Sequence, residues 1–311
     1  MYFDTHAHYD DSAFDADLGA LLPELYASGV GLIIDPGCDV KSSRAAIALA
    51  EEYSFVYAAV GIHPEELAGA AEGDFAVIRE LAAHEKCAAI GEIGLDYYWD
   101  ASRREEQKEL FAKQLELALE LDKPVIIHDR EAHADTFEIV GRYPELRGVF
   151  HCYSGSAEMA KELLKRGWYL GFDGPITYKN ARKNIETLEI CPLDRILIET
   201  DSPYLSPVPM RGKRNDSRNL QYIAAKIAEV KGISAEDAAK ISLENGRRLF
   251  GIWRLKSPWL PLMREQKKFS AYHKTSGKAG GLRINYYLFS TAYALSVAVL
   301  RFLPYQTTIT P

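Results

Sequence analysis

The sequence predicts an α/β fold, a TIM-type (β/α)8 barrel that is followed by a C-terminal extension of uncertain structure. Strand-like apolar runs alternate with helical patterns at intervals of about 25 to 35 residues, and eight such runs precede residue 252. This alternation is typical of parallel βαβ units, and eight units fit a closed barrel. An open doubly wound sheet is the alternative, because the pattern alone does not show closure.

The predicted strands are short runs of β-branched, aromatic and small apolar residues. They cover residues 2–8, 31–37, 55–64, 87–96, 123–130, 148–155, 168–175 and 195–203. The clearest predicted helix spans 103–122, where apolar residues recur at helical spacing among charged ones: Leu110, Phe111, Leu115, Ala118 and Leu121.

The first predicted strand contains "FDTHAH". Side chains alternate along a strand, so Asp4, His6 and His8 are expected on one face, with the two histidines about 6 to 7 Å apart at the backbone. Two imidazoles at this spacing are able to converge on one metal ion. Hydrogen bonding within a barrel is the competing interpretation for the isolated pair.

Ionisable residues recur at the C-terminal ends of the predicted strands. They are His6, His8, His63, Glu92, Asp96, His128, His151 and Asp201. In a barrel all these ends meet at one mouth, where active sites of this architecture lie. Buried histidines and carboxylates cost free energy unless they pair or bind a metal, so their convergence predicts a metal centre.

Six of these residues form a predicted ligand set without a thiolate: His6, His8, Glu92, His128, His151 and Asp201. Six ligands exceed what one four-coordinate ion with an open position needs, but they suffice for two ions about 3.5 to 4 Å apart that share a carboxylate. We expect His6, His8 and Asp201 at one ion, His128 and His151 at the other, and Glu92 between them. The ions expected are Mg²⁺, Mn²⁺ or Zn²⁺.

Three carboxylates have further predicted roles. Asp201 is expected to act also as general base, and Asp4 to support the two first histidines from deeper in the barrel. Glu199 either orients a ligand or pairs with a base in the barrel interior.

The motifs "FDTHAH", "GIHP", "GEIGLDYY", "KPVIIHDREAHADT", "HCYSGS", "LGFDGPITYK", "LIETDSPYL" and "RGKRN" occur in this order. Together they resemble the TatD family of metal-dependent deoxyribonucleases, within the amidohydrolase superfamily, over residues 1 to 252. The resemblance implies a TIM-type barrel, two metals on the ligands named above, a bridging Glu92, and a phosphate contact from His63. It also implies hydrolysis of DNA phosphodiesters, often as a 3′→5′ exonuclease. Ser217 departs from the family, which usually has proline there, and this change is expected to affect the approach to the last barrel helix without touching a ligand.

Several residues near the predicted mouth are candidates for contacting a nucleic acid. Arg211 and Lys213 in "RGKR" and Arg130 after His128 are suited to phosphate groups. Tyr97 in "LDYYW", or its neighbours Tyr98 and Trp99, is suited to stacking on a base. A solvated loop, a salt bridge to Asp135 and simple packing are the respective alternatives.

The charge distribution divides the chain near residue 253. The net charge is −7, which argues against a protein that coats nucleic acid over its whole surface. Residues 253–311 carry nine Lys or Arg against one acid, so we expect a barrel over 1–252 and a basic extension over 253–311. An uncharged run at 284–300 is expected to form an accessory helix or to lack fixed structure rather than to span a membrane.

Four scattered cysteines and the absence of a signal-like N-terminus predict a cytoplasmic protein. The expected function is a metal-dependent hydrolase, a deoxyribonuclease acting on single-stranded DNA or 3′ ends. Two alternatives are an amidohydrolase acting on a small ester, lactone or amide, and a metal-dependent nucleic-acid binding module without turnover. The complete ligand set argues against the second alternative.

Overall fold

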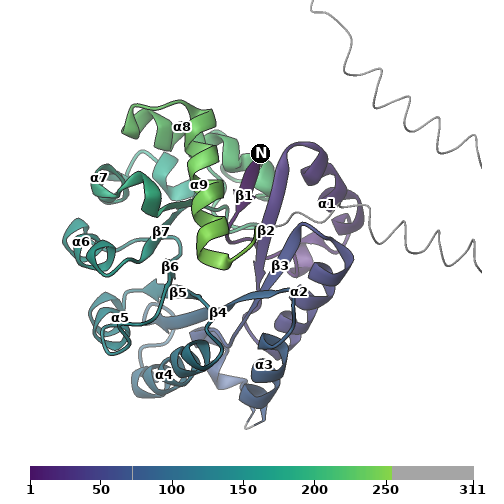
Figure 1. Ribbon diagram of the computed structural model, residues 1–311, viewed down its shortest axis with the longest axis vertical. Coiled ribbons are helices and arrows are strands. Elements are labelled where there is room, and N and C mark those ends of the chain that lie inside the picture. Colours follow the sequence, from purple (N-terminus) through teal and green to yellow (C-terminus); the bar gives the residue numbers. More distant parts are fainter. Residues whose placement is uncertain (72, 254–311) are drawn as a thin grey trace, which may run out of the picture. The chain divides into compact units, whose positions relative to one another are not determined.

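Eight parallel strands form one sheet in which every strand pairs with its neighbours in sequence order (Figure 1). The computed structural model describes residues 1–71 and 73–253. The strands are β1 Tyr2–Asp4, β2 Val30–Pro36, β3 Val56–Val60, β4 Cys87–Asp96, β5 Val125–Arg130, β6 Gly148–Phe150, β7 Tyr169–Phe172 and β8 Ile196–Ile198.

Backbone contacts between the first and last strands bring the sheet edges together. The N–H of Thr5 donates to the carbonyl of Ile198 at 3.3 Å, and the N–H of Asp201 donates to the carbonyl of His6 at 2.9 Å. Ala7 and Ser202 form a parallel bridge. The predicted TIM-type barrel is therefore confirmed, and the open doubly wound sheet is excluded.

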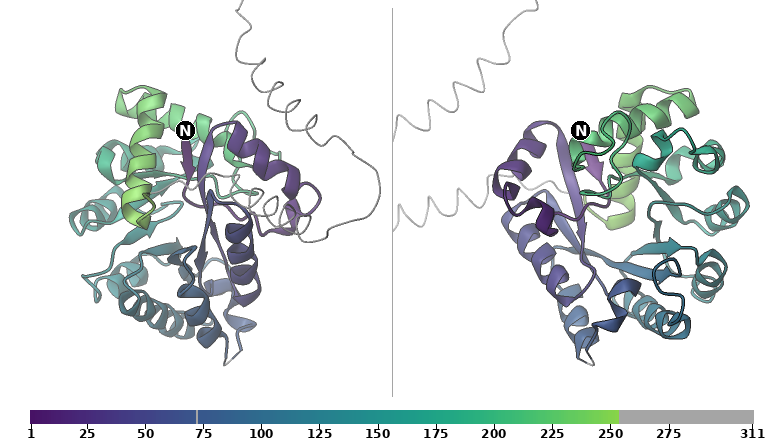
Figure 2. Two further views of the ribbon diagram at one scale, coloured as in Figure 1. Left: turned by 45° about the vertical axis from the view of Figure 1, so that its right-hand side comes forward. Right: turned by 180° about the vertical axis from the view of Figure 1, so that it is seen from behind.

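Helices follow the strands and, apart from the last one, lie around the outside of the barrel, as the views in Figures 1 and 2 show. They are α1 Leu18–Ala27, α2 Val40–Glu52, α3 Asp74–Ala82, α4 Arg104–Glu120, α5 His133–Val140, α6 Ala157–Lys165, α7 Arg182–Ile190, α8 Leu220–Lys231 and α9 Ala235–Phe250. Short 3-10 helices are η1 Ser12–Phe14, η2 Pro64–Ala68, η3 Gly174–Thr177, η4 Leu193–Arg195 and η5 Ser217–Asn219. The helix predicted at 103–122 is confirmed as α4, which buries Phe111, Leu115 and Ala118.

The core consists of two layers because strand side chains alternate between the barrel interior and the surrounding helices. In β2, Leu32 and Ile34 belong to the interior cluster, while Ile33 between them belongs to the cluster under the helices. Helix α9 closes the amino-terminal end of the barrel, where the rings of Phe3 and Phe250 lie 5.9 Å apart. The opposite end of the barrel therefore remains available for a site.

Several strands end earlier than the sequence suggested. β1 ends at Asp4, β6 at Phe150 and β8 at Ile198, so His6, His8, His151 and Asp201 follow their strands instead of lying on them. The chain turns there: Asp201 has a φ of 56°. Leaving the regular ladder lets these side chains turn towards the barrel axis.

The predicted basic extension lies outside the described residues, except for Trp253. This includes the run at 284–300. Among residues 1–71 and 73–253, no helix has the length and apolar character needed to cross a membrane.

Candidate metal centre

The six predicted ligands converge at the carboxyl-terminal mouth of the barrel. His6 and His8 follow β1, Glu92 lies within β4, His128 lies within β5, and His151 directly follows β6. Asp201 comes from the loop after β8. Four groups of His, Cys, Asp and Glu side chains with donor atoms within 4.8 Å of one another lie in the described part of the chain, and all four include one or more of these six residues.

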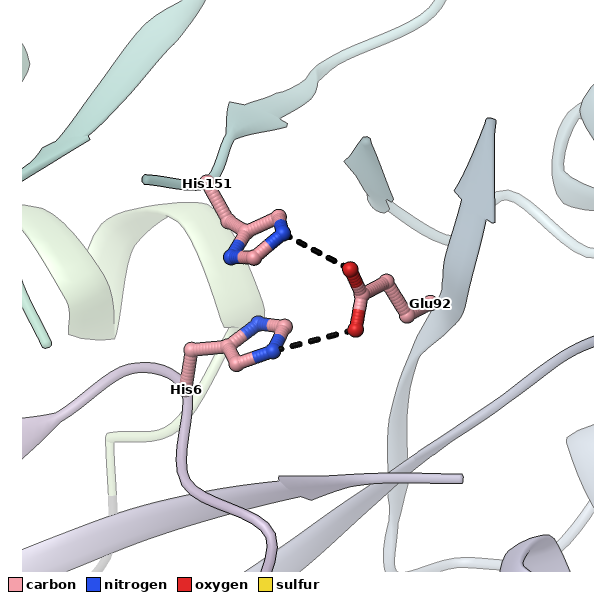
Figure 3. Close-up of side chains that lie close together, drawn as sticks. All are labelled: His6, Glu92 and His151. Atoms are coloured by element: carbon pink, nitrogen blue, oxygen red, sulfur yellow. Dashed lines mark ion pairs between the residues drawn. The ribbon is translucent and has the colours of Figure 1, made fainter. Parts of the chain in front are cut away.

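Glu92 is the centre of the cluster, and its two oxygens face different histidines. Oε2 lies 3.2 Å from Nε2 of His6 and 3.6 Å from Nε2 of His8. Oε1 lies 2.7 Å from Nε2 of His151 and 2.7 Å from Nδ1 of His128. Figure 3 shows the rings of His6 and His151 directed at separate oxygens of this buried carboxylate.

The first histidine pair and Asp201 have the spacing of ligands around one ion. The Nε2 atoms of His6 and His8 lie 3.1 Å apart, and Oδ1 of Asp201 lies 3.6 and 3.5 Å from them. Metal–ligand bonds of about 2.0 to 2.1 Å in a tetrahedral arrangement separate neighbouring donors by roughly 3.4 Å. The donor set present therefore fits a divalent ion at this position.

The tautomer of His8 is set by the backbone. Its Nδ1–H donates to the carbonyl of Pro36 at 3.0 Å, so Nε2 is the ring nitrogen that faces the cluster. His6 is fully buried, and its Nδ1 has no hydrogen-bond partner among the described residues.

The protonation states of His6, Glu92 and Asp201 suit metal binding, because the imidazole is neutral and both carboxyl groups are ionised. Burial and the nearby His151 lower the pKa of His6 to about 4, so this imidazole is neutral at pH 7. Burial alone would raise the pKa of Glu92 and of Asp201. The surrounding histidines outweigh it, holding the pKa of Glu92 well below its ordinary value and that of Asp201 at about 2. These are the protonation states that metal binding requires.

In the second histidine pair, each ring nitrogen of His128 contacts a carboxylate. Nδ1 of His128 lies 3.3 Å from Nε2 of His151, while Nε2 of His128 lies 2.9 Å from Oδ2 of Asp96. Although burial opposes the charged ring, hydrogen bonds to Asp96 and Glu92 raise the pKa of His128 to about 10. The site therefore attracts positive charge strongly at this position.

His63 lies at the edge of the same cluster. Its Nε2 is 3.6 Å from Oε1 of Glu92, and its ring meets that of His128 edge-on with centroids 4.3 Å apart. Its Nδ1 accepts the N–H of Glu65, so His63 also caps η2. His63, the predicted substrate contact, therefore lies close enough to Glu92 to contact a ligand that binds there.

Asp4 supports the first histidine pair through the backbone and not through the rings. One of its oxygens accepts the N–H of Thr200 at 2.9 Å and that of His6 at 3.4 Å. The other accepts the hydroxyls of Thr200 and Ser217, each at 2.6 Å. The Ser217 side chain therefore contacts a buried carboxylate that also accepts the backbone N–H of His6.

Glu199 is oriented towards the candidate ligands. Its Oε1 accepts the N–H of Cys152 at 2.5 Å and lies 3.7 Å from Nδ1 of His151. Among the described residues no Lys or Arg forms an ion pair with Glu199. A Cβ added at Gly171 would lie 2.5 Å from the Glu199 carboxylate, so glycine leaves the room that this side chain occupies. These contacts favour the ligand-orienting alternative over pairing with an interior base.

Two neighbours of the cluster were not predicted as ligands or as substrate contacts. Asp96 was noted at a strand end, but its contact with His128 was not expected. The Cys38 thiol forms one of the four groups with His8 and Glu92, and burial raises its pKa to about 11. Its position two residues after the end of β2, at the mouth, was the available signal for Cys38.

The predicted substrate contacts lie at a strand end and in loops, with Arg130 as the last residue of β5. The guanidinium of Arg130 lies 4.0 Å from the ring centroid of Tyr98, and that of Arg211 lies 4.1 Å from the ring centroid of Tyr178. Lys213 is exposed. Tyr97 is half-buried, and its hydroxyl donates to Asp135 at 2.7 Å.

The other cation of "RGKR" is already engaged. Arg214 pairs with Asp17 through contacts of 2.6 and 2.8 Å. Of this tetrad, Arg211 and Lys213 are therefore the cations that the structure leaves for a ligand within the described residues.

Comparisons with known proteins identify the family. Residues 3–251 match the family described as TatD related DNase. An uncharacterized metal-dependent hydrolase of Bacillus subtilis, YabD, is 46% identical over 254 residues, covering 81% of this chain and 100% of the relative. A protein of Escherichia fergusonii named 3′-5′ ssDNA/RNA exonuclease TatD is 34% identical, covering 80% of this chain and 99% of the relative.

A solved structure gives the same assignment. The crystal structure of YjjV, a TatD homologue from Escherichia coli, superimposes with a TM-score of 0.77 at 32% identity, covering 81% of this chain and 98% of that chain. Since the family match spans nearly all the described residues, the chain belongs to the TatD related DNase family of metal-dependent hydrolases.

Proposed function

We propose that this enzyme hydrolyses phosphodiester bonds of single-stranded nucleic acid, DNA in particular, from the 3′ end with two divalent ions. The observation that carries the proposal is the division of the Glu92 carboxylate, whose Oε2 faces His6 and His8 while Oε1 faces His128 and His151. A carboxylate in this position is suited to bridging two ions. Residues 1–252 are proposed as the catalytic unit.

The ligand assignment follows the predicted one. His6, His8 and Asp201 would hold one ion and His128 and His151 the other, with Glu92 shared; the imidazole and carboxylate donors fit Zn²⁺ or Mn²⁺, and Mg²⁺ with added water. When bound, such a pair of ions supplies an activated water and neutralises charge on the phosphate. Among the six, the side chains of Asp201 and His128 are the most exposed, and the Asp201 carboxylate is ionised at neutral pH.

The chain's own residues then supply positioning and proton transfer. Asp201 is proposed to accept the proton of the attacking water. His63, next to Oε1 of Glu92, is proposed to hold a phosphate oxygen. Arg130, Arg211 and Lys213 are proposed to neutralise neighbouring phosphates, and such contacts weaken as salt concentration rises.

A phosphodiester is favoured over a small neutral ester, lactone or amide by these cations around the mouth. The Escherichia fergusonii relative, named as an exonuclease acting on single-stranded DNA and RNA, supports the same choice. A binding module without turnover is disfavoured because both an ionised base and a complete ligand set are present.

The test uses single-stranded DNA, duplex DNA and RNA, each labelled at either end, with protein loaded with Mn²⁺, Zn²⁺ or Mg²⁺. Hydrolysis from the 3′ end releases a labelled mononucleotide at once from 3′-labelled strands and gives a descending ladder from 5′-labelled strands. Glu92→Ala and Asp201→Ala should abolish both products. Glu66→Ala changes an exposed carboxylate of η2 on the same rim and should leave them unchanged. Hydrolysis of small esters alone, or full activity of the Glu92 and Asp201 variants, would refute the proposal.

A further inference from the structure

Two large aromatic side chains are left exposed beside the candidate metal centre. Tyr98 is 57% exposed and Trp99 is 62% exposed, in the loop that directly follows β4. Their rings meet edge-on with centroids 5.0 Å apart. Tyr97, the preceding residue, packs against the core and donates a hydrogen bond to Asp135. Tyr97 therefore has a structural role, whereas Tyr98 and Trp99 face the solvent.

An arginine completes the exposed cluster. The guanidinium of Arg130 lies 4.0 Å from the Tyr98 centroid and 5.6 Å from the Trp99 centroid. No carboxylate of the described residues lies within ion-pair distance of Arg130. Aromatic faces next to a cation without an ion-pair partner are suited to a ligand that is itself flat and aromatic and carries negative charge.

The cluster is fixed to the candidate metal centre by one carboxylate. Oδ1 of Asp96 accepts the N–H groups of Tyr98 at 2.9 Å and Trp99 at 3.0 Å. Oδ2 of the same residue lies 2.9 Å from Nε2 of His128. The aromatic loop therefore keeps a defined position relative to the ligands, at the distance of a single side chain from His128.

We infer that Tyr98, Trp99 and Arg130 form a stacking site for an unpaired nucleobase of the substrate strand, adjacent to the phosphodiester that is hydrolysed. This inference rests on the proposed function. Stacking tolerates every base because each has a π-face, while Arg130 is placed for the neighbouring phosphate. A base within a duplex has both faces covered, so the site selects single strands and accepts DNA and RNA alike.

Binding is measured by fluorescence anisotropy with two fluorescein-labelled single-stranded phosphorothioate oligonucleotides, which resist hydrolysis. One probe is intact, and the other lacks the bases of its 3′-terminal nucleotides. Wild type should bind the intact probe more tightly. Trp99→Ala should weaken binding of the intact probe roughly 5- to 100-fold and leave the abasic probe unchanged, whereas Trp99→Phe should retain most of the affinity.

Trp253→Ala is the matched control. Trp253 is 67% exposed and follows α9, which covers the opposite end of the barrel, so its removal should change neither affinity. Equal weakening of both probes by Trp99→Ala, no weakening at all, or a wild type that binds neither probe would overturn the inference.

Hydrolysis of the unmodified oligonucleotide separates this inference from the proposed function. A wild type that binds in a base-dependent manner but releases no nucleotide supports the stacking site and refutes the nuclease. A nuclease whose affinity and KM are the same in Trp99→Ala refutes the stacking site alone.

Discussion

Asp96 and His128 form a close contact, with Oδ2 of the carboxylate 2.9 Å from Nε2 of the ring. Glu92 lies 2.7 Å from the other ring nitrogen, so carboxylates hold both sides of this imidazole. Such outer contacts fix the orientation of a metal-binding histidine. Since Asp96 also accepts the N–H groups of Tyr98 and Trp99, one side chain joins the candidate metal centre to the proposed stacking site.

Replacing Asp96 should therefore loosen a metal ligand without removing one. Asp96→Ala should lower metal affinity by about 10- to 100-fold, the usual effect of losing such a contact. Competition with a chelating dye measures this affinity directly. Asp100→Ala removes the next carboxylate of the same loop, which contacts Ser102, and should leave the affinity unchanged. Equal affinities of Asp96→Ala and wild type would show that His128 needs no such support.

The metal content of the protein and its thermal stability should both indicate two bound ions. Elemental analysis of the reconstituted protein should give two ions per chain, and His84→Ala, which changes a histidine outside the cluster, should keep both. An ion present at 100 times its Kd stabilises the folded state by about 2.7 kcal/mol. For a domain of this size that raises Tm by roughly 5 to 10 °C per ion, and a chelator should reverse it. A single ion in wild type would contradict the assignment of Glu92 as a bridge.

The sequence predicts the barrel well because its signal is repeated eight times. Each apolar run is bounded by polar residues, so an error of a few residues at one strand end leaves the topology unchanged. The convergence of the six ligands follows from that topology, since all carboxyl ends of a parallel barrel share one mouth.

The exact contacts at the mouth could not be predicted, because they depend on where the chain leaves the strands. His6 and His8 were expected on one face of a continuous strand, but β1 ends at Asp4 and Ala7 alone makes a bridge to Ser202. The 3.1 Å separation of the two Nε2 atoms results from this irregular backbone. Asp96 likewise contacts His128 through the register of β4 with β5, which no local pattern of the sequence encodes.

The ion pair between Lys108 and Asp135, next to Tyr97, should make the free energy of unfolding depend on pH. Lys108 at 2.8 Å, and then the hydroxyl of Tyr97, lower the pKa of Asp135. A lowered pKa means that the stabilisation is fully present above the ordinary pKa of aspartate and is lost as pH falls through the lowered value. A double-mutant cycle of Asp135→Asn and Lys108→Met, followed by urea unfolding, should give a coupling of a few tenths of a kcal/mol at pH 7, because the pair is partly exposed. A coupling that grows towards acid pH would contradict this assignment.

The buried network around Asp4 should make this chain intolerant of proline at position 217. The Ser217 hydroxyl donates to Asp4 at 2.6 Å and lies 2.7 Å from the hydroxyl of Tyr9, while its N–H donates to that hydroxyl at 2.9 Å. Proline fits the first position of η5 sterically, but it removes both the hydroxyl and the N–H. Asp4 then loses a donor inside the protein, and Tyr9 loses two partners.

Ser217→Pro should therefore lower the free energy of unfolding by about 1 to 3 kcal/mol, the cost of leaving a buried polar group without its partner. Ser217→Ala keeps the N–H bond to Tyr9 and should cost less. Urea denaturation measures both, with Ser12→Ala as control, because Ser12 is the exposed first residue of another 3-10 helix. Combining Ser217→Pro with Tyr9→Phe removes the stranded hydroxyl and should recover part of the loss. A Ser217→Pro variant as stable as wild type would show that Thr200 and the backbone alone satisfy Asp4.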